Sequence, residues 1–305
     1  MKHLSLAARY RPQTFAQVAG QDMVKAVLSR AAAEDRPAAA YLLSGTRGVG
    51  KTTIARIFAK ALNCEHAPGP EPCNECAQCR KITQGIHVDV TEIDGASNNS
   101  VEDARSLRET IGYAPMEGRY KVFIIDEAHM LTRESFNALL KTLEEPPAHV
   151  IFILATTEIQ KVPATILSRC QRHSFKRIPV DTIAARLNYV AQQERLDLQP
   201  DAAALLARMA DGGMRDALSI LDQCIGRSNG HVTYGLVAET AGLAGRGHLI
   251  ELAECIRTGD RTAALEKINA LYKSSKDMGR LCEELAGFFR NLMLIKTMKD
   301  ASGLV

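Results

Sequence analysis

The sequence predicts an α/β domain built on a mostly parallel sheet and followed by helical domains. Three observations carry this prediction. From residue 41 to about 178, short apolar runs alternate with helical patterns, which is typical of strands joined by crossover helices. In two of these runs, KVFII and VIFIL, the apolar residues are continuous rather than alternating with polar ones, as in strands covered on both faces. After Pro179 only helical patterns follow.

The composition is that of a globular protein. The 305 residues, of which 46% are hydrophobic and 24% charged, suffice for two or three domains. Because 38 basic residues nearly cancel 35 acidic ones, the net charge of +3 does not by itself indicate nucleic-acid binding. Arg9 and Arg11 interrupt the first apolar residues, and no later stretch resembles a membrane span. We therefore expect a cytoplasmic protein without membrane contact.

The expected elements follow from the spacing of apolar residues. Strands are expected at 40–44, 87–93, 121–126, 149–156 and near Ser174–Phe175. A helix that ends before Pro146 carries one apolar stripe, made of Phe136, Leu139, Leu140 and Leu143.

The rest of the chain is expected to be helical. Apolar stripes predict helices within 180–242, with a break at Gly212–Gly213. A further helical segment, about 248–298, has so many apolar positions that it would need a partner surface to cover them.

A phosphate-binding loop is predicted from Gly45 to Thr53. GTRGVGKTT fits G-x-x-x-x-G-K-[ST] and lies between a strand and a helix, as this motif requires. Lys51 is expected to reach the β and γ phosphates of ATP, and the Thr52 hydroxyl to ligate Mg²⁺. The alternative, a glycine turn with an incidental lysine, does not account for the flanking strand and helix. The other residues expected to line the site are Gly45, Thr46, Arg47, Gly48, Val49, Gly50 and Thr53.

Two acidic residues follow the strand KVFII. The strand brings Asp126 and Glu127 to its carboxyl end, where ligands gather in open α/β sheets. We expect Asp126 to hold the magnesium ion and Glu127 to polarise the attacking water. The alternative is an acidic pair that caps the next helix.

Two threonines end the strand HVIFILA. Thr156 or Thr157 is expected to hydrogen-bond the γ phosphate or the attacking water. The alternative is that both residues only cap the strand end.

Four cysteines have metal-ligand spacing. Cys64, Cys73, Cys76 and Cys79 form C-x₈-C-x₂-C-x₂-C, and two-residue gaps allow neighbouring thiolates to meet on one ion. Four such ligands leave no open position, so the sequence predicts a structural Zn²⁺ site. The alternative is four reduced thiols without a metal.

Several motifs together resemble the AAA+ ATPases and, within them, the gamma/tau family of bacterial DNA polymerase III clamp-loader subunits. The resemblance covers residues 7 to about 224 and rests on ARYRPQTFAQVAGQ, GTRGVGKT, the cysteine insertion, DEAHMLTRESFNALLKTLEEPP, ATTEIQKVPATILSRCQR and GGMRDALSILDQ. It implies an ATPase that drives loading of a sliding clamp onto primer-template DNA.

The resemblance also implies a domain organisation. A RecA-like domain over 1–178 would include the cysteine insertion at 64–79, and a helical lid would cover 179–242. Residues 243–305 would begin a helical collar that joins five loader subunits, and we expect this collar to be truncated. The implied partners are delta and delta-prime type subunits, further gamma/tau copies, the clamp and DNA.

Further site residues are implied by the same resemblance. Arg169, in the Ser-Arg-Cys run, would act as an arginine finger in the ATP site of the neighbouring subunit, and the alternative is a surface ion pair. Arg215 would contact the γ phosphate from the lid. It stands in the first turn of a helix, where a cation is unfavourable unless an anion such as nucleotide or Asp216 compensates. The expected contacts to adenine are Tyr10, Arg11, Pro12 and Val18.

Candidates for DNA contact are few. A helix that begins near Asn98, Asn99 and Ser100 offers neutral hydrogen-bond donors, and Lys141 follows the DEAH run. An ordinary solvated helix start and surface lysine explain these residues equally well.

Three functions are weighed. The first is the clamp-loader motor, and the second is a scaffold in which nucleotide binding acts only as a conformational switch. The third is a DEAH-type helicase, suggested by Asp126 to His129. It fares worst because such a helicase needs a second RecA-like half, whereas residues 180–305 lack alternating strands.

Overall fold

The computed structural model describes residues 4–97, 110–242, 246–274 and 277–298. Their contacts divide the chain into two compact units, Met1–Val190 with Ala207–Ser219, and Ala191–Leu206 with Ile220–Val305. Among the described residues, none of the helices has the length and apolarity that crossing a membrane demands.

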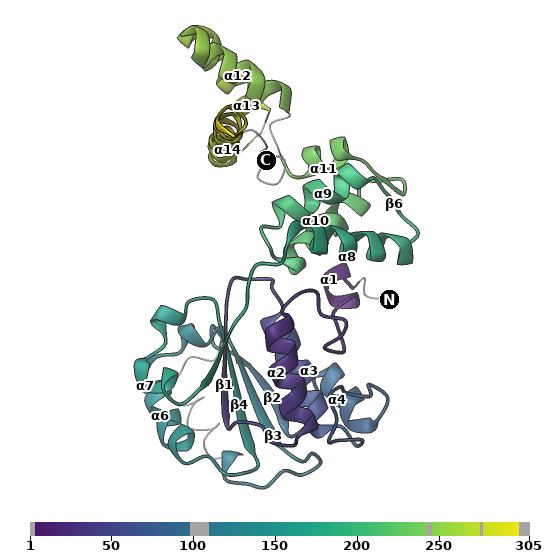
Figure 1. The fold of residues 1–305 in the computed structure, drawn as a ribbon, viewed down its shortest axis with the longest axis vertical. Helices are drawn as coiled ribbons and strands as arrows, with labels where there is room; N and C mark the ends of the chain where they lie inside the picture. Colours follow the sequence, from purple (N-terminus) through teal and green to yellow (C-terminus); the bar gives the residue numbers. More distant parts are fainter. Residues whose placement is uncertain (1–3, 98–109, 243–245, 275–276, 299–305) are drawn as a thin grey trace. The chain divides into compact units, whose positions relative to one another are not determined.

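A five-stranded parallel sheet forms the centre of the first unit, as predicted (Figure 1). Its spatial order is β2-β3-β4-β1-β5. The strands span β1 Ala40–Ser44, β2 Val90–Asp94, β3 Lys121–Asp126, β4 Val150–Thr156 and β5 Gln171–Ser174. In the register, Ser44 pairs with Thr156 and Asp94 with Asp126, so the polar carboxyl ends of the strands meet at one edge.

Helices cover both faces of this sheet (Figure 1). The face with Leu43, Ile124 and Ile153 packs on α2 and α3, and the face with Leu42, Ile125 and Leu154 packs on α6 and α7. Burial on both faces explains the continuous apolar runs. In the described part of the chain before Pro179, the helices and 3₁₀ turns are α1 Leu6–Arg9, α2 Asp22–Ala33, α3 Lys51–Asn63, α4 Ala77–Gln84, η1 Ala128–Met130, α6 Arg133–Glu144, η2 Ile159–Lys161 and α7 Ala164–Leu167.

The strand expected at 87–93 begins later, at Val90. The Asp89 carboxylate is fully buried and accepts the backbone N–H groups of Met116, Glu117 and Gly118 at 2.7–3.0 Å. His87 Nδ1 accepts the Asp89 N–H at 3.0 Å. These bonds hold residues 87–89 in a turn and prevent them from extending the strand.

The region expected to be purely helical also contains two short strands. Its helices are α8 Val180–Gln193, α9 Pro200–Met209, α10 Met214–Ile225 and α11 Tyr234–Thr240. In the second unit, β6 Asp197–Leu198 pairs in parallel with β7 His231–Val232. Two-residue strands are too short to show an alternating pattern, which explains why the sequence did not predict them.

The last three helices form a small cluster of their own. They are α12 Arg246–Thr258, α13 Arg261–Lys273 and α14 Met278–Thr297, and they bury Leu252, Leu271 and Leu281 between them. Ile256 and Met293 are more than half exposed. This exposure agrees with the expectation that the segment requires a partner surface.

Candidate functional site

The loop from Gly45 to Gly50 joins β1 to α3 in conformations that favour glycine. Gly45 has φ = 150°, and a Cβ atom there would lie 2.6 Å from the backbone oxygen of Phe175. Gly50 precedes the first residue of α3 with φ = 101°. The loop therefore turns tightly into the amino end of α3, an arrangement that favours anion binding.

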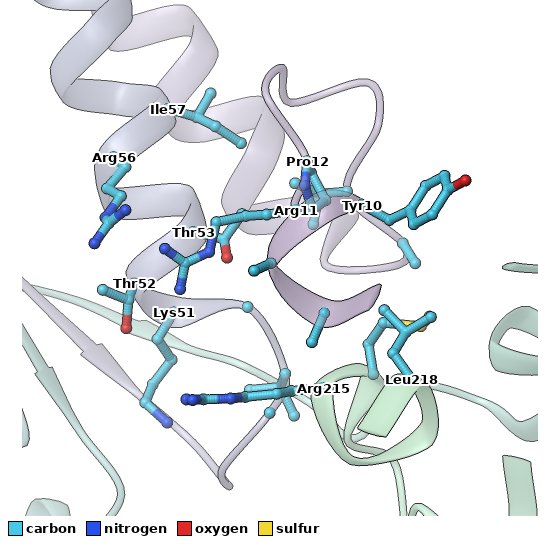
Figure 2. A pocket seen from close by; sticks show the side chains of 18 of the residues that line it. Tyr10, Arg11, Pro12, Lys51, Thr52, Thr53, Arg56, Ile57, Arg215 and Leu218 are labelled. Atoms are coloured by element: carbon cyan, nitrogen blue, oxygen red, sulfur yellow. The ribbon is translucent and has the colours of Figure 1, made fainter. Parts of the chain in front are cut away.

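Lys51 starts α3 and points into the pocket beside this loop (Figure 2). Its ammonium group donates to the backbone oxygens of Gly45 and Thr46 at 2.9 and 2.8 Å. The side chain is nearly fully buried. Burial lowers the pKa of Lys51, and the charges of Glu127 and Asp126 oppose this decrease. A bound anion would supply the negative charge that such a buried ammonium favours.

Thr52 and Asp126 come together at the carboxyl end of β3. The Thr52 hydroxyl donates to Asp126 Oδ2 at 2.6 Å, although the two residues are 74 positions apart. The other carboxylate oxygen of Asp126 accepts the Glu127 N–H at 2.9 Å. A hydroxyl and a carboxylate next to a phosphate loop are the oxygen ligands that Mg²⁺ prefers, so these side chains fit that ion.

Glu127 has an unusual backbone conformation, with φ = 45°. This left-handed region costs a residue with a side chain about 1–3 kcal/mol, and such strain clusters at functional sites. Glu127 Oε2 accepts the Thr157 hydroxyl at 3.1 Å and lies 3.4 Å from His129 Nδ1. Thr156, in contrast, is fully buried and contacts His129 Nδ1 at 3.1 Å. Of the two threonines, Thr157 is therefore the one beside the acidic group.

A cavity of about 510 Å³ opens over the loop (Figure 2). Lys51 and Thr52 lie on one side of it, and Tyr10, Pro12 and Leu218 lie on the other. The cavity thus has a cationic, hydroxyl-bearing side and a more apolar side, as a nucleotide site requires. The predicted residues that line it are Tyr10, Arg11, Pro12, Val18, Arg47, Gly48, Val49, Gly50, Lys51, Thr52, Thr53, Asp126, Glu127 and Arg215.

Several positively charged side chains line the cavity. Burial lowers the pKa of Arg11, and the nearby charges of Arg56 and Arg215 lower it further, although Glu92 and Asp126 oppose them. The Arg215 side chain extends towards Lys51 (Figure 2). Among the described residues, no ion pair joins Arg215 to Asp216. The cationic side chains of Arg11, Lys51 and Arg215 in this cavity suit a ligand with several negative charges.

Arg169 lies outside the group of residues that line this cavity. It follows α7, on the sheet face opposite α3, and donates to Glu144 Oε1 at 2.6 Å and to the backbone oxygen of Thr165 at 2.7 Å. In the isolated chain Arg169 therefore makes a surface ion pair and does not contact the phosphate loop of its own chain.

The four cysteines meet as predicted, and their Sγ atoms lie within 4.8 Å of one another. The Sγ atoms of Cys64 and Cys76, and those of Cys73 and Cys79, are 4.0 Å apart. Four thiolates around one ion at ~2.3 Å would place their sulfurs about 3.8 Å apart, so the cluster fits a tetrahedral ion such as Zn²⁺.

Four residues were predicted as candidates for DNA contact. Asn98, Asn99, Ser100 and the side chain of Lys141 lie outside the described residues.

Sequence reasoning missed several residues of the pocket. Arg56, Ile57 and Lys60 line it from α3, and Arg186 lines it from α8. Residues 53, 56, 57 and 60 follow the i, i+3, i+4, i+7 spacing of one helix face. Because Thr53 was predicted to line the site, this spacing could have indicated Arg56, Ile57 and Lys60 as well. Arg186 had no comparable signal.

Comparisons with protein families give three consecutive matches. Residues 20–179 match a model described as "DNA polymerase III, delta subunit", and residues 182–230 match the ATPase lid domain of DNA polymerase III clamp-loader subunits. Residues 232–304 match domain III of DNA polymerase III subunits gamma and tau.

Curated relatives carry corresponding names. DNA polymerase III subunit tau of Bacillus subtilis is 46% identical over all of this chain and 54% of its own length. The Escherichia coli subunit tau is 45% identical over 99% of this chain and 47% of its own. The gamma subunit of Buchnera aphidicola (from Acyrthosiphon pisum) is 39% identical over 96% of this chain and 81% of its own. The chain thus spans about half the length of the tau relatives.

Among solved structures, the RuvB Holliday junction branch migration motor of Thermotoga maritima is similar in fold. The TM-score is 0.57 at 18% identity, over 82% of this chain and 80% of that chain. At this identity the likeness concerns the fold alone, and it agrees with the RecA-like P-loop domain predicted from the sequence.

Proposed function

Because this chain belongs to the gamma/tau family of bacterial DNA polymerase III subunits, we propose that it is an ATP-driven motor subunit of the clamp loader. In this proposal, ATP binding and hydrolysis drive the loading of a sliding clamp onto primer-template DNA. The observation that carries it is the hydrogen bond from Thr52 to Asp126 beside the buried ammonium of Lys51, an arrangement that fits a phosphate and magnesium site. An intact site of this kind is what hydrolysis, rather than a purely structural role, requires.

The phosphate end of ATP is assigned to the loop and α3. Backbone N–H groups of residues 45–50 would bind the phosphates, and Lys51 would leave the carbonyl groups of Gly45 and Thr46 to contact the β and γ phosphates. Thr52 and Asp126 would hold Mg²⁺, which supplies neutralising charge between the phosphates when bound. Arg215 would contact the γ phosphate.

Glu127 is assigned the role of orienting the water that attacks the γ phosphate. Its carboxylate would accept a hydrogen bond from this water and so orient it, with Thr157 as the neighbouring donor. The base would lie between Tyr10, Pro12 and Val18, and Arg169 would reach the site of the neighbouring subunit.

We further propose that Zn²⁺ occupies the cysteine cluster. Purified, reduced protein is expected to hold about one equivalent of zinc, because four thiolates complete a closed tetrahedral site. Elemental analysis measures this directly. Cys73→Ser with Cys76→Ser should lose the metal, whereas Cys282→Ser should keep it, since Cys282 is exposed on α14. A zinc content below about a tenth of an equivalent in the unaltered protein would contradict the proposal.

The organisation that we propose has a RecA-like domain at 1–178, a lid at 179–242 and the start of a collar at 243–305. The border between the first two family matches, near residue 180, supports the end of the RecA-like domain, whereas the lid match ends at 230 and the domain III match begins at 232, before the proposed start of the collar. The proposed partners are delta and delta-prime type subunits and further gamma/tau copies in a five-subunit ring, together with the clamp and DNA. Asn98, Asn99, Ser100 and Lys141 remain candidates for DNA contact, and the proposed location is the cytoplasm.

The function is tested in the complete clamp-loader assembly that contains this chain. We expect ATP hydrolysis that increases when clamp and primed DNA are added, together with transfer of labelled clamp onto the DNA. ATP binding with no turnover in the assembled ring would instead favour a nucleotide-gated scaffold. Separation of DNA strands without clamp transfer would favour a helicase and would contradict the proposal.

A further inference from the structure

The cysteine module, residues 64–79, is hydrogen-bonded to the wall of the nucleotide pocket. The Glu71 carboxylate accepts the backbone N–H groups of Phe15 and Ala16, one with each oxygen, at 2.8 Å. Phe15 and Ala16 do not line the pocket themselves, but the residues on either side of them in the segment 10–18 do, namely Tyr10, Arg11, Pro12, Gln13, Gln17 and Val18. Glu71 thus joins a loop held by the four cysteines to a segment that faces the nucleotide.

Lys60 makes a second connection between the same two parts. Its ammonium group donates to Asn74 Oδ1 of the module at 2.6 Å, and to the backbone and side-chain oxygens of Gln13 at 2.9 and 2.7 Å. The Lys60 side chain is 2% exposed, and the residue lines the pocket. A buried ammonium holds its acceptors firmly, because releasing any of them would leave it unsatisfied.

The cysteines also shape the helix that completes this wall. Cys76 is the N-cap of α4, and its sulfur accepts the Cys79 N–H at 3.4 Å. One turn later on α4, Ile82 and Thr83 line the pocket. The Thr83 hydroxyl donates to Gln13 Oε1 at 3.3 Å.

We propose that Glu71 and Lys60 are positioning residues that couple the metal centre to the nucleotide pocket. The ordered cysteine module holds residues 10–18 against the base and sugar of the nucleotide in two ways: directly, through the Glu71 contacts with Phe15 and Ala16, and indirectly, through Lys60, which binds both Asn74 and Gln13. Loss of the metal would release this wall and weaken ATP binding while leaving the phosphate loop in place. This inference rests on the proposed nucleotide site and adds a regulatory contact to it.

Coupling between two binding sites is reciprocal. If metal in the cysteine module strengthens ATP binding, then bound ATP must strengthen metal retention by the same factor. Couplings of this kind typically change affinity about 5- to 150-fold, and the two Glu71 hydrogen bonds place the expected effect near tenfold.

The first measurement is the dissociation constant of ATP and, separately, of inorganic tripolyphosphate, each with magnesium. Tripolyphosphate fills the phosphate side of the pocket but offers no base to residues 10–18. Glu71→Ala is expected to weaken ATP binding about tenfold and tripolyphosphate binding much less. Glu71→Gln keeps one of the two acceptor oxygens and should weaken ATP binding about threefold. Glu75→Ala removes an exposed carboxylate of the same module and should bind both ligands normally.

The second measurement follows zinc transfer to a coloured chelator. ATP is expected to slow this transfer about tenfold in the unaltered protein and to have little effect in Glu71→Ala. Thermal unfolding of each variant shows whether the fold is intact.

The outcomes separate this inference from the proposed function. If the unaltered protein binds both ligands and Glu71→Ala binds ATP equally well, the coupling is wrong and the ATP site stands. An equal loss for ATP and tripolyphosphate would also overturn it, because Glu71 would then act on the whole fold. If the unaltered protein binds neither ligand, the proposed function and the coupling both fail.

Discussion

Arg169→Ala is expected to lower the rate of ATP hydrolysis by the assembled ring by ~10³ to 10⁵, with ATP binding retained. The lower limit corresponds to about 4 kcal/mol of transition-state stabilisation. A partly exposed ion pair such as Arg169 with Glu144 contributes only about 0–1 kcal/mol, so losing it cannot produce an effect of this size. The steady-state rate with clamp and primed DNA present measures the change.

Mixing two inactive chains decides whether the arginine acts in its own chain or in the next. Lys51→Ala removes the phosphate contact but keeps Arg169, and Arg169→Ala does the reverse. If the finger acts between subunits, rings that contain both chains regain activity wherever an intact Lys51 site meets an intact Arg169. Arg30→Ala, which removes an exposed arginine paired with Glu34, should retain full activity. Assembled mixed rings without activity would contradict a finger in trans.

Glu127→Gln is expected to lower hydrolysis about 10²- to 10⁴-fold while ATP affinity changes little. The amide cannot polarise the attacking water as a carboxylate does, whereas Lys51, Thr52 and Asp126 remain to bind the phosphates and magnesium. Single-turnover hydrolysis and equilibrium ATP binding measure the two effects separately.

The matched control for Glu127→Gln is Glu34→Gln, an exposed carboxylate at the residue that follows α2. It should leave both measurements unchanged. A Glu127→Gln protein that hydrolyses ATP normally would remove Glu127 from the chemistry and would indicate that the strained backbone at this position serves only the turn after β3.

Features of the fold that depend on residues close together in the sequence were predictable. The continuous apolar runs predicted the parallel sheet, because only strands covered on both faces are apolar throughout. The β3 strand began and ended as expected, since the charged residues Lys121 and Asp126 bound the apolar run VFII. The 87–93 strand was placed too early because the burial of Asp89 depends on a turn at residues 116–118, which is distant in sequence.

The residues of the candidate site likewise fall into those that the sequence predicted and those that only the fold brings together. The sequence by itself determined the phosphate loop and the four-cysteine centre, because in both the reactive groups stand within one short segment whose spacing reports their geometry. The strand order brought Thr52 to Asp126, and helix packing brought Arg56 and Lys60 to the pocket.

Only the tertiary structure decided that Glu71 contacts Phe15, 56 residues away, and that Arg169 makes no contact with its own phosphate loop. The physical reason is that hydrogen bonds between distant loops depend on how the chain returns on itself. The spacing of apolar residues along the sequence does not indicate which distant loops will meet.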